Sequence, residues 1–86
     1  MASYRIEFLP SAQKEFAKLP RSVQQRIALK LELLRENPYL PGVKQLKNGE
    51  GRLRLRVGDC RVIYRVEQDT LIVIVIQVGH RREVYQ

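Results

Sequence analysis

Apolar and polar positions change their spacing along this chain, from a brief alternation to a helical repeat and back to alternation. Residues 4–9 alternate, which predicts a short strand with Tyr4, Ile6 and Phe8 on one face. Pro10 ends that pattern. Apolar residues then follow at helical spacing up to Leu19, with Ser11 as the expected helix cap and Pro20 as the stop.

A second, longer helix is predicted after Ser22, which is placed to cap it. Its apolar residues repeat every three or four positions and form one stripe: Val23, Ile27, Leu31 and Leu34. The helix should stop at Asn37, because the residue before Pro38 disfavours helical backbone angles. Two helices joined by so few residues are expected to form a hairpin.

Three strands are predicted after a connecting loop over residues 39–51. Gly58 and Asp59 read as the two central residues of a tight hairpin, since glycine in the first place suits a type II′ turn. That turn would set position 56 opposite 61, 54 opposite 63, and 52 opposite 65. The last strand, over residues 71–76, is apolar on both faces and should therefore lie inside the sheet.

These elements predict one α+β domain over residues 1–86, with the order strand, helix, helix, strand, strand, strand. The sheet should be mostly antiparallel, with the helical hairpin packed on one face. The length supports this, because 86 residues can bury only one modest core.

Charge changes this picture by pointing to a partner. The chain has 16 Lys and Arg against 9 Asp and Glu, a formal net charge of +7. Such a balance favours polyanions, chiefly nucleic acid, or an acidic protein. Alternation places Arg52, Arg54 and Arg56 on one strand face, opposite the apolar face of the same strand. Stacked like charges are unfavourable until an anion arrives, so this face is the leading candidate for function.

Few other residues offer chemistry. Cys60 is the only cysteine, so no internal disulfide can form, and its strand parity predicts a small buried thiol. One cysteine and one histidine, His80, do not make a metal site, and we expect neither a metal nor a cofactor. The N-terminus lacks a signal-like apolar region, and the longest apolar run is too short to cross a bilayer, so a cytoplasmic protein without membrane contact is expected.

Three stretches of sequence resemble the RelE/ParE superfamily of toxins, and in particular the RelE-type messenger-RNA endonucleases. They are the opening run over residues 8–19, the segment Gly58–Tyr64 and the tail Val78–Tyr85. Each is weak alone, but their order matches, and the resemblance spans almost the whole chain. It implies a microbial-RNase-like RelE fold.

The resemblance implies a toxin that cleaves translated messenger RNA in the ribosomal A site and is neutralised by a cognate antitoxin. Its partners would then be the antitoxin, the ribosome and messenger RNA. By the same resemblance Arg61 contacts the scissile phosphate, Arg81 stabilises the transition state, and Tyr85 stacks on or orients the substrate. Arg52 and Arg54 stand where well-known relatives carry lysines.

This replacement of lysine by arginine affects the expected chemistry. Attack by a ribose 2′-hydroxyl needs a base, an acid and cations for the phosphorane charge. Arginine keeps its proton, so Arg52 and Arg54 are expected to clamp phosphate, with Arg56, Lys44 and Lys47 as further backbone contacts. The candidates for the base that takes the 2′-hydroxyl proton are Glu50, Glu83, His80 and Tyr85. His80 has the best intrinsic pKa for that task. The products would be a 2′,3′-cyclic phosphate and a 5′-hydroxyl, without a metal.

Two other functions stay open at this point. A ParE-type toxin would inhibit DNA gyrase with the same fold and no RNA cleavage. A non-catalytic module would bind only nucleic acid or an antitoxin, which the lack of an obvious acid–base pair allows. Simpler interpretations also stand for single residues: Arg52 and Arg56 as solvated edge residues, His80 as a hydrogen-bonding residue, and Tyr85 as part of a frayed end.

Overall fold

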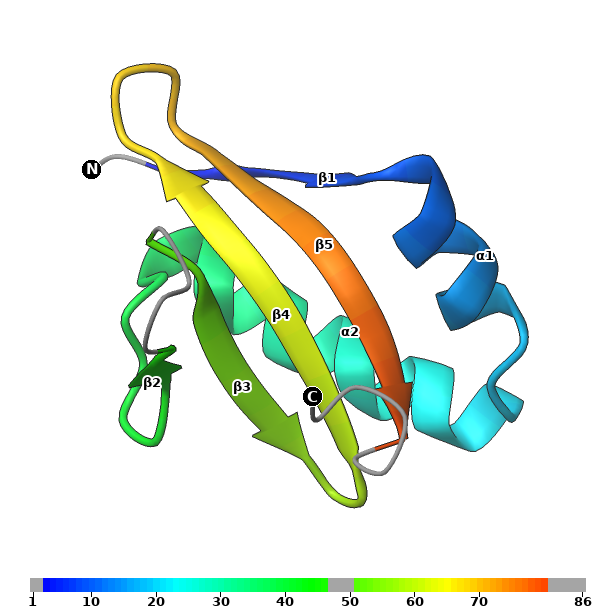
Figure 1. The fold of residues 1–86 in the computed structure, drawn as a ribbon. Helices are drawn as coiled ribbons and strands as arrows, with labels where there is room; N and C mark the ends of the chain where they lie inside the picture. Colours follow the sequence, from blue (N-terminus) through cyan, green and yellow to red (C-terminus); the bar gives the residue numbers. More distant parts are fainter. Residues whose placement is uncertain (1–2, 47–50, 81–86) are drawn as a thin grey trace.

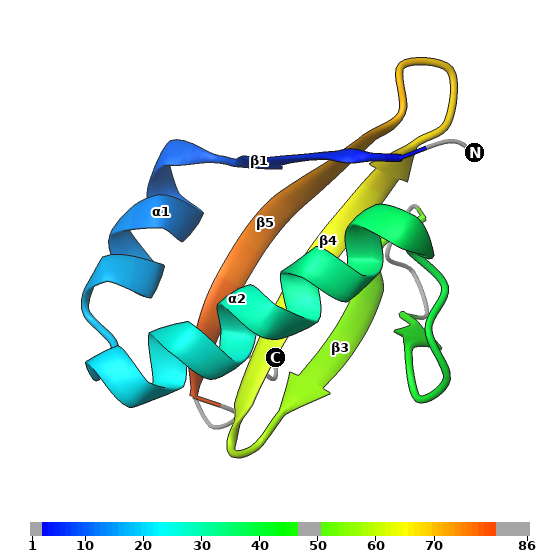
Figure 2. The same cartoon turned by 180° about the vertical axis from the view of Figure 1, so that it is seen from behind.

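A five-stranded sheet with two helices on one side forms the structure, a computed structural model that describes residues 3–46 and 51–80 (Figures 1 and 2). The elements in chain order are β1 (Arg5–Phe8), α1 (Pro10–Ala17), α2 (Arg21–Glu36), β2 (Lys44–Gln45), β3 (Leu53–Val57), β4 (Cys60–Glu67) and β5 (Ile72–His80). The strand order in the sheet is β1-β5-β4-β3-β2. The predicted α+β class and helical hairpin are confirmed.

The sheet differs from the prediction at its two edges. The loop expected over residues 39–51 contains the two-residue strand β2, which pairs antiparallel with β3. At the other edge, β1 pairs parallel with β5, while the remaining pairs are antiparallel. The strand β5 has a neighbour on each side, as its apolar sequence predicted, but it continues to His80.

Prolines, and not serines, start both helices. The helix α1 begins at Pro10 and α2 begins just after Pro20, so the predicted caps at Ser11 and Ser22 are wrong. Proline suits a helix start because its φ is already helical and the first N–H groups need no partner inside the helix. Each helix is therefore capped two residues earlier than predicted, at Leu9 instead of Ser11 and at Pro20 instead of Ser22.

The side chain of Gln24 joins the two helices. Its Nε2 donates to the carbonyl oxygens of Phe16, Ala17 and Leu19, at 3.0, 3.2 and 3.0 Å. The last carbonyls of a helix lack partners within the helix, so this amide satisfies the end of α1 from the first turn of α2. Gln24, which lies outside the apolar stripe predicted for this helix, thus holds the hairpin together.

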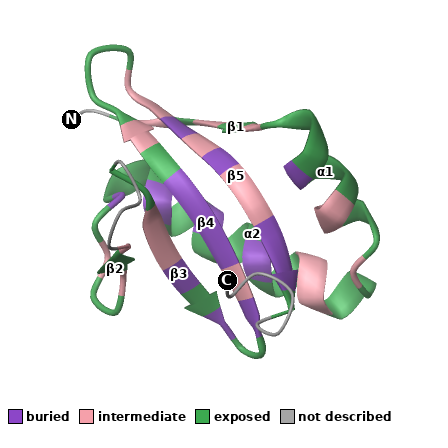
Figure 3. Ribbon diagram, viewed as in Figure 1, coloured by how far each residue is buried: buried purple, intermediate pink, exposed green. Residues whose placement is uncertain are grey.

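The core lies between the helices and the facing side of the sheet (Figure 3). The helices contribute Ala12, Ile27, Leu31 and Leu34. The sheet contributes alternate residues of three strands: Leu55, Val57, Cys60, Val62, Tyr64, Val73, Val75 and Val78. This confirms the predicted helical stripe and the predicted burial of Cys60. Each strand therefore has one face in the core and one face turned away from the helices.

Tyr64 is the largest fully buried side chain. Its hydroxyl donates to the carbonyl oxygen of Pro38 at 2.5 Å and so ties β4 to the segment after α2. Burial, and to a lesser degree the nearby Tyr39, raises the pKa of Tyr64 well above its ordinary value of 10.0. The phenol is therefore neutral at physiological pH and acts as a structural donor.

The hairpin between β3 and β4 has the predicted register. Gly58 has a φ of +59°. Among the described residues other than glycine, only Leu71 has a positive φ, so the φ of Asp59 is negative and fits the second central place of a type II′ turn. The register sets Arg56 opposite Arg61, as expected.

A β-bulge shifts the register between β4 and β5. Ile63 pairs with Gln77, but Tyr64 pairs with Val75, so β5 carries one extra residue. Past Val75, where the pairing of β1 with β5 ends, the carboxylate of Glu15 accepts a hydrogen bond from the Val78 N–H at 2.9 Å. The helix α1 thus anchors the last part of β5.

Candidate nucleic-acid interface

The candidate site is built on the sheet face that no helix covers within residues 3–46 and 51–80 (Figures 1 and 2). In β3 the apolar residues Leu55 and Val57 are buried against the helices. Arg54 and Arg56 alternate with them and therefore project from the opposite face. Hydrophobic burial on one side of β3 fixes the position of the arginines on the other.

Pairing between strands adds two further cations to this face. Arg56 lies directly opposite Arg61 of β4, and Arg54 lies directly opposite Lys44 of β2. Directly paired residues share a face, with Cβ atoms typically about 4.5–5.5 Å apart. We call these four residues the arginine face: Lys44, Arg54, Arg56 and Arg61.

The four residues differ in exposure. Lys44 and Arg56 are exposed, whereas Arg54 and Arg61 are half-buried, and the Nε atom of Arg61 is shielded from solvent. The Arg56 Nε donates to the carbonyl oxygen of Gly58 at 3.1 Å, which holds that side chain over its own hairpin. Arg61 is thus the most firmly embedded of the charges predicted to contact phosphate, and its neighbour on β5 is Gly79, which has no side chain.

Arg65, further along β4, is also on this sheet face, but an ion pair compensates its charge. Its Nε lies 3.2 Å from a carboxylate oxygen of Glu67. Arg61 and Arg65 therefore share one face of β4 but differ in their neighbours, since Arg61 lies opposite Arg56 and Arg65 pairs with Glu67. This makes Arg65 a natural reference for the role of Arg61.

Other predicted site residues lie elsewhere. Arg52 is exposed and precedes β3, with its carbonyl oxygen accepting a hydrogen bond from the Leu46 N–H at 3.1 Å. The ladder between β3 and β4 has the predicted register but begins with Leu53 opposite Tyr64, one residue short of the expected pair of Arg52 and Arg65. Lys47, Arg81 and Tyr85 lie outside the described residues, as do the base candidates Glu50 and Glu83.

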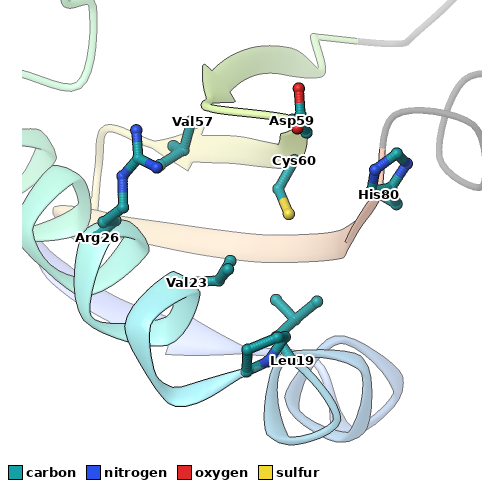
Figure 4. Close-up of a pocket in the computed structure, with 8 residues that line it drawn as sticks. Leu19, Val23, Arg26, Val57, Asp59, Cys60 and His80 are labelled. Carbon is teal, nitrogen blue, oxygen red and sulfur yellow. The ribbon is translucent and has the colours of Figure 1, made fainter.

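The structure does not bring His80 to the arginine face. His80 pairs with Cys60, and Cys60 belongs to the core face of β4. Both residues line a cleft of about 220 Å³ between the β3–β4 hairpin and the start of α2, together with Leu19, Pro20, Val23, Arg26, Val57 and Asp59. Figure 4 shows the Cys60 sulfur directed toward the helices and His80 at the end of β5. The sheet therefore separates His80 from Arg61.

Arg26 is a residue whose position the sequence did not reveal. A Cβ atom on Gly58 would lie 3.3 Å from its Nη1, so the guanidinium packs over the hairpin turn. Arg26 lies outside the apolar stripe predicted for α2, and no pattern in the sequence indicated its contact with the turn at Gly58. Its charge extends the basic surface around the edge of the sheet.

The described part of the chain contains neither a cluster of metal ligands nor a membrane-spanning helix. Across residues 3–46 and 51–80, no cluster of three or more His, Cys, Asp and Glu side chains could hold a metal ion. In the same part of the chain, no helix is both long enough and apolar enough to span a bilayer.

Comparison with known proteins places this geometry in a family. Residues 6–85 match the model of the family described as the ParE toxin of the type II toxin–antitoxin system parDE. An Escherichia coli protein provisionally described as a RelE-like toxin is 35% identical over 80 residues, which cover 91% of this chain and 83% of that protein. The chain belongs to the RelE/ParE superfamily of type II toxins.

Solved structures of RelE proteins share the fold. The isolated E. coli RelE toxin aligns with a TM-score of 0.81 and 28% identity, over 91% of this chain and 84% of that one. RelE in the intact E. coli RelBE toxin–antitoxin complex aligns with a TM-score of 0.80 and 29% identity, over 91% and 96% of the two chains. The predicted superfamily and RelE-like fold are thus confirmed, and this protein is a RelE-like toxin of a toxin–antitoxin system.

Proposed function

We propose that this RelE-like toxin is a ribosome-dependent endoribonuclease that cleaves translated messenger RNA in the A site. The observation that carries the proposal is the direct pairing of Arg56 with Arg61 beside Arg54 and Lys44 on one sheet face. Four cations in two adjacent rows of the sheet form a surface that suits a polyanion such as a ribose–phosphate backbone.

The arginines would act by binding charge. Guanidinium groups donate in a planar fork that fits phosphate oxygens, and they stay protonated throughout the reaction. As the 2′-hydroxyl attacks, negative charge grows on the phosphorane, and Arg61 is the best held of the described residues to stabilise it. Arg81, which follows β5 directly in the sequence, is proposed to supply a second donor, and Tyr85 to orient the substrate.

Proton transfer is proposed to come from a group other than His80. The register puts His80 and Arg61 on opposite faces of the sheet, so one phosphodiester cannot easily contact both. Glu50, Glu83, Tyr85 or the ribosome itself remain the sources of a base for the 2′-hydroxyl. The expected products are a 2′,3′-cyclic phosphate and a 5′-hydroxyl.

Inhibition of DNA gyrase is the second candidate. The observation in its favour is the family model itself, which is that of ParE toxins and matches residues 6–85. Against it stands the concentration of arginines on one open face, which suits RNA cleavage better than contact with a protein target. An inert binding module would explain the charge but not the embedding of Arg61.

A cognate antitoxin is the proposed partner of this chain. Support comes from neighbours such as the E. coli RelBE complex, in which RelE is solved with its antitoxin. An inhibitory partner of a basic toxin should itself be acidic where it approaches the arginine face.

Primer extension on translated messages, with purified ribosomes and the purified toxin, tests the proposal. A nuclease should produce cuts at fixed codon positions on ribosome-bound messages. A gyrase inhibitor should leave messages intact and instead cause DNA breaks and filamentation when induced in cells. The absence of both outcomes would support the inert module and refute the nuclease.

A further inference from the structure

A pocket of about 350 Å³ lies at the end of β3 and β4 that is remote from their hairpin. We call it the tyrosine pocket, and its lining residues are Tyr39, Gln45, Gly51, Leu53, Val66 and Gln68. They come from the segment after α2, from β2, and from the start of β3 and the end of β4. Ligand pockets in proteins usually measure about 300–1,000 Å³, so this one suits a small group.

The tyrosine pocket combines apolar surface with neutral polar groups. Leu53 lies opposite the buried Tyr64, so it belongs to the helix-covered face of the sheet. Leu53 and Val66 are both half-buried. The side-chain amides of Gln45 and Gln68 add hydrogen-bond donors and acceptors. Such a lining suits a flat group with apolar faces and a polar edge, which is the description of a nucleobase.

Tyr39 is an exposed aromatic residue that its neighbours hold in place. It is 50% exposed, and its N–H donates to the Asn37 Oδ1 at 3.0 Å. The carbonyl just before it, that of Pro38, accepts the hydrogen bond from the buried Tyr64. Its hydroxyl accepts a hydrogen bond from the Gln68 Nε2 at 2.8 Å. A ring that is already ordered loses little freedom when a ligand binds.

The strand β2 connects the tyrosine pocket to the arginine face. Lys44 pairs with Arg54 and belongs to that face, while the next residue, Gln45, pairs with Leu53 and lines the pocket. Neighbouring residues of a strand point to opposite faces, so β2 presents one side chain to each site. A chain bound along the arginine face can therefore reach the pocket by passing around this edge of the sheet.

Charge beside the tyrosine pocket favours a nucleotide over a protein side chain. Lys44 and Arg52 are exposed cations, and Arg52 lies in the sequence between two residues that line the pocket. The carboxylate of Glu67 lies 3.2 Å from the Arg65 guanidinium, which compensates its charge. No charged residue lines the pocket itself. A neutral pocket flanked by cations fits a neutral base joined to an anionic phosphate.

We propose that the tyrosine pocket binds one unstacked nucleobase of the RNA strand whose phosphates lie on the arginine face. The base stacks on Tyr39 and contacts Leu53 and Val66. The amides of Gln45 and Gln68 bond to the edge of the base. The inference deepens the proposed function and rests on it, because the strand would be the messenger that the toxin cleaves.

The test compares two short chains of equal length that bind the purified toxin. One is a 2′-O-methyl RNA, in which no 2′-hydroxyl is available for attack. The other has the same sugar–phosphate backbone without bases. In an NMR titration, the chain with bases should shift the methyl signals of Leu53 and Val66. The chain without bases should bind through charge alone, leave those signals in place and bind about tenfold more weakly.

Variants that keep the net charge locate the contact. Tyr39→Leu should weaken binding of the chain with bases by about tenfold and leave binding of the other chain unchanged, because only stacking is lost. Tyr39→Phe retains the ring and should weaken binding less than about threefold. Leu33→Ala is the matched control, since Leu33 is also 50% exposed but does not line the tyrosine pocket, and it should change neither affinity.

The outcomes separate the tyrosine pocket from the nuclease. Equal affinity of the wild type for both chains, or unshifted Leu53 and Val66 signals, would overturn the base contact and leave the proposed nuclease standing. An equal loss for both chains in Tyr39→Leu would also overturn it, because a stacking contact cannot affect a chain that has no base. Base-dependent binding by a wild type that does not cleave ribosome-bound messages would refute the nuclease and support the pocket.

Discussion

The same strands make both faces of the sheet, but apolar residues dominate one face and cations the other. The helix-covered face carries Val62 and Tyr64, which are fully buried, and the opposite face carries Arg61 directly opposite Arg56. The first face gains stability from burial, and the second face loses some through repulsion. The comparison shows that burial on one face of the sheet fixes the strands that carry the arginine face on the other.

The largest effect that would test this difference between the two faces is expected from Arg61→Ala. Removing the best-held cation should lower message cleavage by about 10²–10³-fold, the usual effect of losing one preorganised donor to a developing oxyanion. The free energy of unfolding should change little, because Arg61 lies on the sheet face opposite the core. Primer extension with purified ribosomes measures the first effect, and thermal unfolding measures the second.

The matched control is Arg65→Ala, on the same strand and face. Because Arg65 pairs with Glu67, its loss should change cleavage only a few-fold. Equal losses in both variants would mean that overall charge, and not the position of Arg61, drives the reaction.

On the buried face, Tyr64→Phe should cost about 1–3 kcal/mol of unfolding free energy, because the carbonyl of Pro38 loses its donor in the interior. Denaturant titration measures this cost. Cleavage below the unfolding temperature should be unaffected, because the hydroxyl points away from the arginine face. A loss of activity without a loss of stability would contradict the separation of the two faces.

The same residue gives stability a dependence on pH. The pKa of Tyr64 is raised in the folded state, so the fold retains the phenol proton more tightly than the unfolded chain does. This contribution is complete below the ordinary pKa of 10.0 and is lost as pH rises above it. The unfolding free energy of the wild type should therefore fall more steeply above pH 10 than that of the Tyr64→Phe variant.

The hairpin turn links the two faces and should respond more weakly. Gly58→Ala should cost about 1 kcal/mol or more, because the positive φ disfavours a side chain and the new Cβ would meet Arg26. Gly42→Ala is the control, since Gly42 also has positive φ but nothing lies within 4 Å of the added Cβ. Denaturant titration of both variants isolates the contact with Arg26, and equal costs would show that the contact adds nothing.

The smallest effect is expected from His80→Ala. Because His80 lies across the sheet from Arg61, cleavage should change less than about threefold, well below the 10²–10⁴-fold typical of losing a general base. Cleavage rates of the wild type and the variant, measured by primer extension with purified ribosomes, check this. A loss of about a hundredfold or more would return His80 to the reaction.

Periodicity in the sequence predicted the parts of the fold that depend on burial. Local physical rules predicted the stripe through Ile27 and Leu31, the alternation of β3 and the turn at Gly58. The turn and the alternation together also predicted the pairing of Arg56 with Arg61. The helix starts were less accessible, because both proline and serine fit a first turn and only packing decided between them.

What the sequence could not supply depended on contacts between distant elements. The bulge in β5 reversed the parity that would otherwise relate Val75 to His80, and no residue in that run signals an extra position. Likewise, the parallel pairing of β1 with β5 and the contact of Arg26 with Gly58 arise only once α2 crosses the sheet. The side of the sheet on which His80 lies was therefore beyond reach of a pattern.

The amide of Gln24 has a consequence for the order of assembly. An isolated helix as short as α1 is unstable in water, and here its final carbonyls are completed by a residue of α2. The shorter helix should consequently form only after the longer one and fray whenever the longer one opens. The helices α1 and α2 would then unfold in one cooperative step, because the Gln24 side chain joins them.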